Sequence, residues 1–145
     1  MSTGKVKCWG NNSFGQLGLE NTTPLGINPS TIGENIPFVD LGSGVKARDI
    51  TAGENHNCVL TTTNEIKCWG ANGNGQLGIG SLSAKGASAG DMGDNLPVVD
   101  FPANSVRGVY AGGKTTCALL VGPELKCWGY TPFVALYIIQ CKIYL

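Results

Sequence analysis

The sequence predicts an all-β protein built from repeated antiparallel sheets that are stacked or arranged radially. The first observation is a tetrapeptide, Lys-Cys-Trp-Gly, which begins at residues 7, 67 and 126, so that its copies lie 60 and then 59 residues apart. The second is composition, because 22 of the 145 residues are glycine, roughly twice the average share. The third is that the apolar runs are short, interrupted by Gly, Pro and Asn, and show no helical periodicity.

Four further matches keep the same register and extend the repeat over most of the chain. They pair residues 15–18 with 75–78, 35–37 with 95–97, 39–40 with 99–100, and 52–53 with 111–112. The repeat predicts units near 8–67 and 68–127 within a repeat region at 1–129. Residues 130–145 abandon the pattern and are predicted to be a non-homologous C-terminal tail.

Three short strands are expected in each unit, taken here in chain order. Residues 46–51 and 106–110 each form a first strand. Residues 57–62 and 65–69 flank Thr63-Asn64 as a hairpin, and residues 116–120 and 125–128 flank a second turn at 121–124. The Gly-Gln-Leu-Gly segments are expected to be turns, and residues 19–35 and 79–95 are expected to be exposed loops.

The charge balance excludes several classes of partner. Ten basic and ten acidic side chains give a formal net charge of zero. No excess charge attracts the surface to nucleic acid or to anionic lipid, so neither is expected as a partner. The N-terminus carries no apolar stretch of the length of an export signal, and the longest apolar run, 133–139, is far shorter than the ~20 residues that cross a bilayer.

Four of the six cysteines form pairs ten residues apart, Cys58 with Cys68 and Cys117 with Cys127. A hairpin centred on residue 63 places the first pair directly opposite each other, and one centred on residue 122 does the same for the second. Cross-strand Cβ separations of ~4.5–5.5 Å are close to disulfide geometry. The alternative is that these are buried free thiols, and both readings stay open. Cys8 has no partner at this spacing, which suggests a missing upstream segment.

Other motifs carry less weight. His56 is the single histidine, and no nucleophile or set of metal ligands accompanies it, so a structural role is expected. Gly73, Gly75 and Gly78 match the dinucleotide fingerprint, but a loop follows them where that motif needs a helix. The glycosylation sequons at Asn11 and Asn21 matter only on the secretory route, and the lack of a leader discounts them.

The combined pattern Cys-Trp-Gly-x-Asn-x-x-Gly-Gln-Leu-Gly, followed by Ala-Gly-x-x-His-x-Cys, resembles the repeat of the regulator of chromosome condensation family. The likeness covers residues 7–129, and the second copy departs from it at Lys114-Thr115. It implies a β-propeller with one four-stranded blade per repeat and seven blades in a closed ring, so this chain holds about two blades of an incomplete propeller. Trp-Asp propellers and β-solenoids fit less well, because Gly follows every Trp and a solenoid coil is about half this period. The structural repeat motif comprises Trp9, Gly10, Gly15, Gln16, Leu17, Gly18, His56, Trp69, Gly70, Gly75, Gln76, Leu77, Gly78 and Trp128.

Two functions follow as expectations. The first is a non-catalytic module that mediates protein–protein interaction, and the alternative is guanine-nucleotide exchange on a small GTPase, which the namesake of the family performs. A propeller enzyme would need paired carboxylates around a channel, and the repeats place none there recognisably. We therefore expect no enzyme activity, no cofactor and no metal. We do expect a protein partner, and self-association through exposed blade faces.

Overall fold

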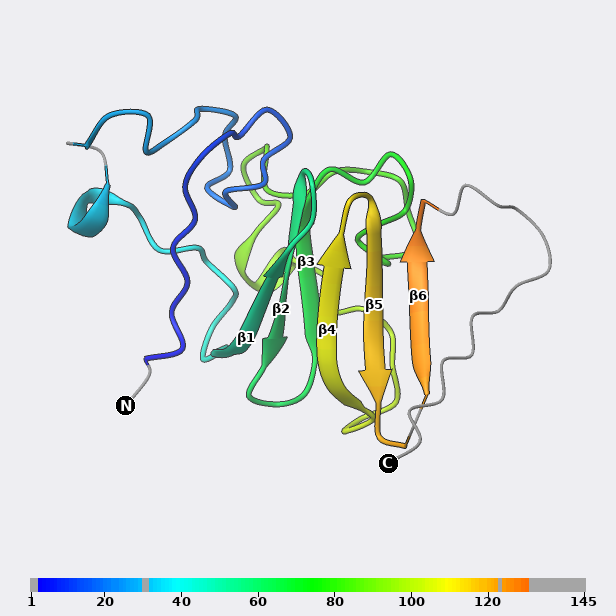
Figure 1. The fold of residues 1–145 in the computed structure, drawn as a ribbon. Coiled ribbons are helices and arrows are strands. Elements are labelled where there is room, and N and C mark those ends of the chain that lie inside the picture. Colours follow the sequence, from blue (N-terminus) through cyan, green and yellow to red (C-terminus); the bar gives the residue numbers. More distant parts are fainter. Residues whose placement is uncertain (1–2, 30–31, 123, 131–145) are drawn as a thin grey trace.

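The computed structural model describes residues 3–29, 32–122 and 124–130. Within them the chain forms two antiparallel sheets of three strands each and two short 3-10 turns (Figure 1). The bounds are β1 (Ala47–Ala52), β2 (His56–Thr61), β3 (Ile66–Gly70), β4 (Val106–Gly112), β5 (Thr115–Leu120), β6 (Leu125–Gly129), η2 (Gly33–Asn35) and η3 (Gly93–Asn95). None of the described residues form a helix long and apolar enough to cross a bilayer. All but the first residue of the predicted tail lies outside the described residues.

Each sheet contains the predicted hairpin in the predicted register. Cys58 lies opposite Cys68 and Leu60 opposite Ile66, and the second sheet repeats this with Cys117 opposite Cys127. The first turn closes through Asn64, whose φ of 63° lies in the left-handed region that asparagine tolerates better than most residues. The strand predictions are therefore confirmed to within one or two residues.

Each sheet has three strands rather than the four that the family resemblance implies. In the first unit the place of a fourth strand beside β3 is held by a single bridge between Lys67 and Val98. One hydrogen bond supports it, from the backbone N–H of Val99 to the carbonyl of Ile66, at 2.8 Å. Pro97 precedes this bridge and has no N–H to donate, so the ladder does not extend in that direction.

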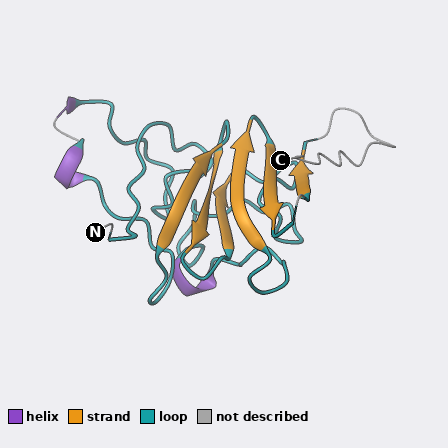
Figure 2. Cartoon of the chain, turned by 60° about the horizontal axis from the view of Figure 1, so that its bottom comes forward, coloured by secondary structure: helices purple, strands orange, loops and turns teal. Residues whose placement is uncertain are grey.

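Strands β2 and β3 of the first sheet are buried on both of their faces, whereas β1 at the edge is half-buried or exposed throughout. Alternate residues of a strand point to opposite faces, so neighbours in β2 and β3 enter different cores. One core lies between the two sheets, and the other lies between the first sheet and the N-terminal segment (Figure 2). The first core includes Cys58, Leu60, Ile66, Val109 and Ala118. The second includes Val6, Val39, Val59, Trp69 and Leu96.

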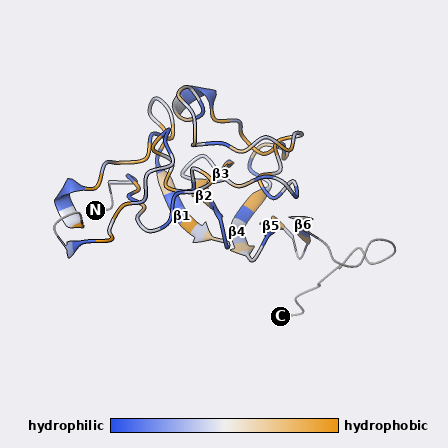
Figure 3. Cartoon of the chain, turned by 90° about the horizontal axis from the view of Figure 1, so that it is seen from above, coloured by the Kyte–Doolittle hydropathy of each residue, from blue (hydrophilic) through white to orange (hydrophobic). Residues whose placement is uncertain are grey.

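The N-terminal segment, the first sheet and the second sheet follow one another as layers, as the view along the strands shows (Figure 3). The second sheet is covered on one face only. Cys127 at its outer face is exposed, whereas its counterpart Cys68 is 0% exposed beneath the second sheet. The first sheet therefore shows how a neighbouring repeat buries this face.

Candidate functional site: the joints between repeats

The repeat motifs meet at two equivalent joints, where the Gly-Gln-Leu-Gly turn of one repeat contacts the tryptophan of the next. At the first joint the carbonyl of Gln16 accepts hydrogen bonds from Trp69 Nε1 at 2.9 Å and Asn57 Nδ2 at 2.7 Å. At the second, the carbonyl of Gln76 accepts them from Trp128 Nε1 at 3.0 Å and Thr116 Oγ1 at 2.8 Å. A buried indole N–H needs such an acceptor, so the turn satisfies it.

A buried asparagine holds each turn in place. Oδ1 of Asn12 accepts from the backbone N–H of Leu17 at 2.9 Å, and Oδ1 of Asn72 accepts from Leu77 at 3.0 Å. The amide nitrogen of each asparagine donates to two carbonyls in the loop that follows, which for Asn72 are those of Ser81 and Ser83. Both asparagines are 0–1% exposed, and their side chains are fully used in fixing the turn.

The last glycine of each turn leaves room for the tryptophan. Gly18 and Gly78 both have φ of +67°, in the left-handed region. A Cβ on Gly18 would lie 2.9 Å from Trp69 Nε1, and one on Gly78 would lie 2.6 Å from Trp128 Nε1. Any side chain here would collide with the indole that the turn receives.

The other motif residues are either buried or form backbone hydrogen bonds. Leu17 and Leu77 are buried, and Gly15 and Gly75 donate backbone hydrogen bonds inside the turns. Gly10 bridges to Leu25, and Gly70 bridges to Lys85, so each glycine after a tryptophan ties its strand end to the following loop. Trp9 is the exception, because it is 60% exposed and no turn of the described residues receives its indole.

The lysine of the tetrapeptide supports the 3-10 turn of its own repeat. Lys7 donates to the carbonyl of Gly33 at 3.1 Å, and Lys67 donates to the carbonyls of Gly93 at 3.3 Å and Leu41 at 2.7 Å. Lys67 is buried, and its ammonium lies among these carbonyls. The third copy, Lys126, is exposed and lies 3.7 Å from the carboxylate of Glu124.

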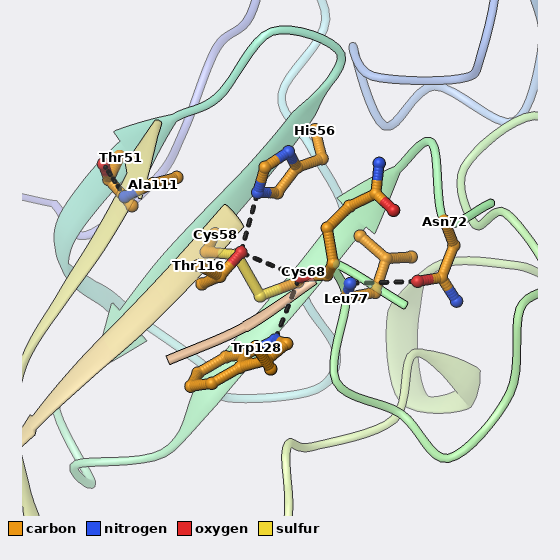
Figure 4. The surroundings of a disulfide bond; sticks show 10 residues. Thr51, His56, Cys58, Cys68, Asn72, Leu77, Ala111, Thr116 and Trp128 are labelled. Atoms are coloured by element: carbon orange, nitrogen blue, oxygen red, sulfur yellow. Dashed lines mark hydrogen bonds between the residues drawn. A yellow bond between two sulfur atoms is a disulfide. The ribbon is translucent and has the colours of Figure 1, made fainter. Parts of the chain in front are cut away.

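His56 lies in the second joint and has a structural environment (Figure 4). Its Nε2 lies 2.8 Å from Thr116 Oγ1, whose single hydroxyl hydrogen is donated to the carbonyl of Gln76. Nε2 must therefore carry the proton, and Nδ1 is left as an unpaired acceptor in the described structure. A Cβ on Gly53 would overlap Cε1 and Nδ1 of the ring, so the close approach of the ring requires glycine there. Burial lowers the pKa of His56 below 6.5. The Thr116 hydroxyl beside the ring is committed to the carbonyl of Gln76.

In the structure the sulfurs of Cys58 and Cys68 are bonded, as are those of Cys117 and Cys127 (Figure 4 shows the first pair). The local register accounts for this pairing. The N–H of Thr61 bonds to the carbonyl of Glu65, and hydrogen-bonded pairs alternate along the hairpin, so Cys58 and Cys68 occupy a non-hydrogen-bonded pair. Side chains come closest at such pairs, and the Cα atoms here are 4.1 Å apart. That these bonds persist in the cell stays a prediction.

Cys8 is a free thiol in a half-buried position. Burial raises the pKa of this thiol from 9.0 to about 11. At neutral pH the thiolate fraction is therefore very small, and the thiolate is the form that reacts with disulfides and electrophiles. The thiol of Cys8 is therefore unreactive in this position.

Two carboxylates, those of Asp94 and Glu20, also join the repeats. The carboxylate of Asp94 accepts from the backbone N–H of Ser43 at 2.7 Å and from its hydroxyl at 2.8 Å, and these hydrogen bonds lower the pKa of Asp94. Glu20 Oε1 accepts from the N–H groups of Gly90 and Met92. Both carboxylates tie one repeat to a loop of the other. No local pattern marks them, because their partners lie 51 to 72 residues away.

No group of three or more metal-ligating side chains gathers anywhere in the described part of the chain. The glycines of the apparent dinucleotide fingerprint lie in the second turn, where the carbonyl of Gln76 faces a tryptophan. An open groove beside the first loop has a mixed lining, in which Leu19, Leu25 and Phe38 lie beside the acidic Glu20 and Asp40. The joints are structural devices, and the surfaces available to a ligand are loops, edges and this groove.

Comparison with known proteins agrees with this organisation. Two models described as Regulator of chromosome condensation (RCC1) repeat match residues 3–60 and 47–76. The Ultraviolet-B receptor UVR8 of Arabidopsis thaliana is 30% identical over 129 residues, which cover 87% of this chain and 25% of the receptor. The X-linked retinitis pigmentosa GTPase regulator of Mus musculus is 31% identical over 127 residues, covering 86% of this chain and 11% of the regulator.

A solved structure shows the same fold. The crystal structure of Prp20p from Saccharomyces cerevisiae superposes with a TM-score of 0.60 at 21% identity, over 86% of this chain and 29% of Prp20p. The chain thus spans at most about a quarter of the curated relatives and under a third of this structure. Matching repeats and matching blades together establish that the chain belongs to the regulator of chromosome condensation repeat family of β-propellers.

Proposed function

We propose that the chain is a non-catalytic propeller module that binds another protein through its loops. The observation that carries the proposal is the use of the reactive side chains. The ring of His56 and the ammonium of Lys67 make hydrogen bonds that join separate segments of the fold, and the amides of Asn12 and Asn72 fix the turns. Such groups are unavailable for chemistry on a substrate, whereas the loops between them are exposed.

The loops at one end of the sheets are the preferred binding surface. Residues 10–29 and 71–85 lie towards this end (Figure 1). They expose large apolar side chains that the joints do not use, among them Ile27, 72% exposed, and Leu82, 66% exposed. The hairpin turn after β5 lies at the opposite end and exposes Val121 to a similar extent, 64%. Val121 therefore provides a matched control.

The test compares two variants in a crosslinking experiment on the full chain. The native chain is expected to crosslink to its partner protein. The double variant Ile27→Ser with Leu82→Ser is expected not to form this crosslink, because apolar loop contacts are removed. Val121→Ser is expected to retain it. Equal retention by both variants would contradict the assignment of the surface, and detection of substrate turnover by the purified chain would contradict the non-catalytic role.

Nucleotide exchange on a small GTPase is the alternative, and relatives favour it. One curated relative is named as a GTPase regulator, and the Prp20p structure is described with its binding to Gsp1p and histones. An exchange factor needs no catalytic triad, because it acts by favouring the nucleotide-free state of its partner. A nucleotide-release assay over a panel of small GTPases decides, and no acceleration of release would remove this alternative.

Self-association through the open face of the second sheet also remains a proposal. Leu119 and Leu125 are half-buried on that face, whereas their counterparts Leu60 and Ile66 are fully buried beneath the next sheet. A second copy that covered the face would bury these residues. Sedimentation equilibrium is expected to show an oligomer that Leu119→Lys dissociates, and a monomer at all concentrations would rule self-association out.

A further inference from the structure

We propose that Asn11 is an N-glycosylation site and that Asn21, the other sequon, is not modified. The substrate class is a lipid-pyrophosphate-linked oligosaccharide. In the step, Nδ2 of Asn11 attacks the anomeric carbon, an N–C bond forms, the C–O bond to pyrophosphate breaks, and Nδ2 loses one proton. Three independent features of the chain lead to this assignment: the geometry at Asn11, the contrasting geometry at Asn21, and the cystines of the hairpins.

Asn11 presents the reacting atom to solvent. Its neighbour Asn12 is 0% exposed and points into the turn, so the exposed side chain of Asn11 points outward. Oδ1 of Asn11 accepts from the backbone N–H of Ser13 at 2.8 Å and from the Ser13 hydroxyl at 2.7 Å. The amide and the hydroxyl of the sequon are therefore already in contact. Nδ2 has no hydrogen-bond partner among the described residues, so a glycan there displaces no contact.

Asn21 is exposed as well, but its amide is committed to the fold. Nδ2 donates to the carbonyl of Leu19 at 2.9 Å. Oδ1 accepts from the N–H of Thr23 at 2.9 Å and from Nδ2 of the buried Asn12 at 3.2 Å. The Thr23 hydroxyl makes no contact with this amide. Asn21 is part of the network that fixes the first turn, and this network competes with modification of its amide.

The hairpin cystines are the observation that favours the route on which the modification occurs. Both complete sheets carry the same cross-strand bond, and disulfides of this kind form and persist in oxidising compartments. N-linked glycans are added in such a compartment, on sequons of exposed loops in secreted proteins. The equivalent positions of the second repeat are Ala71 and Ser81, so the first repeat alone can carry a glycan.

The experiment uses the chain purified from the cells that make it. Trypsin releases residues 8–46 as one peptide, which holds both sequons, so each serves as the other's control. An N-glycosidase in heavy-oxygen water converts a glycosylated asparagine into labelled aspartate, and fragmentation locates the label. We expect the label at Asn11 and none at Asn21. No label at either residue would overturn the proposal, and a label at Asn21 would overturn the selectivity.

Two variants provide a second readout on the intact protein. Asn11→Gln is expected to abolish the change in gel mobility on deglycosylation, and Asn21→Gln is expected to leave the change intact. The Asn11→Gln variant keeps an amide, and the two hydrogen bonds that it alters, both to Ser13, lie at the exposed surface and hold no buried group. Mapping the cysteines in the same preparation tests the compartment. Free thiols at Cys58 and Cys68 would contradict the premise, and this outcome is separate from the binding experiments above.

Discussion

At each joint a backbone carbonyl of the Gly-Gln-Leu-Gly turn accepts hydrogen bonds from two side chains of the sheet that follows it. The carbonyl of Gln76 accepts from an indole N–H and a hydroxyl, and that of Gln16 accepts from an indole N–H and an amide. A carbonyl has two lone pairs, so both are used. The donor beside the tryptophan differs between joints, Asn57 in one and Thr116 in the other. Both joints therefore have a hydrogen-bond donor at this place, an amide in one and a hydroxyl in the other.

The space beside the indole makes a sharp prediction about glycine. Gly78→Ala is expected to destabilise the chain by ~1–2 kcal/mol for the left-handed backbone and by a further ~1–3 kcal/mol for crowding Trp128. Gly80→Ala is the matched control, because its φ is +72° and no atom lies within 4 Å of an added Cβ. It should cost the backbone term alone. Urea unfolding measures the free energy of unfolding of both variants. Equal decreases would show that a side chain at residue 78 does not crowd the indole of Trp128.

The buried imidazole of His56 makes stability depend on pH. Burial lowers the pKa of the folded His56 below 6.5, whereas the unfolded chain keeps the ordinary value. As pH falls below 6.5 the unfolded state binds the proton first, so the free energy of unfolding falls with pH. Above that pH the contribution is complete. The urea concentration at the midpoint of unfolding should decrease as the pH is lowered from about 7 to about 5.

His56→Gln is the control for that decline, because glutamine can still donate to Thr116 and does not titrate. The variant should show a flat profile over the same range. The Asp94 carboxyl does not interfere, because its pKa is lowered from 3.8 and its contribution is lost only at more acidic pH. An unchanged slope in the variant would mean that another group causes the decline.

At the scale of one element, the contribution of the tetrapeptide lysine to stability depends on how deeply its neighbours bury it. Lys67→Met is expected to cost ~1.5–3 kcal/mol, because charged hydrogen bonds to the carbonyls of Leu41 and Gly93 are lost. Lys126→Met changes the same motif position in an exposed setting and should stay within ~0.5 kcal/mol. Thermal unfolding of the two variants provides the comparison. Equal effects would show that burial does not set the contribution.

The two hairpin disulfides should differ in reactivity although they share one register. Cys58 and Cys68 are 0% exposed between the sheets, whereas Cys127 is exposed. A thiolate must reach a sulfur to exchange with it, so access favours reduction of the second bond. Brief treatment with dithiothreitol, then alkylation and peptide mass spectrometry, should find labelled Cys117 and Cys127 first. Simultaneous labelling of both pairs would contradict the burial of the first.

Elements and their register were predictable, and the joints were not. The fixed ten-residue spacing of the cysteines and the flanking turns determine each hairpin, because register follows from alternation and turn length. The 3-10 turns at Gly33 and Gly93 fell within segments predicted to be loops. The contact of Gln76 with Trp128 crosses 52 residues and leaves no local trace. Recurrence of Gln before Leu-Gly was the available signal, and it marked importance without giving a partner.

For the whole molecule, the layers explain why strand β3 of the first sheet is buried and its counterpart β6 in the second sheet is not. The first sheet has a core on each face, so its β3 strand is buried at every position. The second sheet has the same sequence pattern and one core, so its β6 strand is half-buried or exposed throughout. Burial therefore depends on the neighbour and not on the strand's own residues. This is how stability is distributed in repeat proteins, where interfaces contribute beside each unit.

Because the two sheets share a core, a destabilising substitution in one sheet is predicted to destabilise the other. Val109 lies on β4, is 1% exposed, and belongs to the same core as Leu60 and Ile66 of the first sheet. Val109→Ala should cost roughly 1–3 kcal/mol and lower the hydrogen-exchange protection of amides in β2 as well as in β5, because both sheets pack on the new cavity. Val121→Ala, at an exposed turn, should leave protection unchanged. If exchange quickens only in β4, β5 and β6, each sheet is stable by itself and the interface between the repeats contributes little.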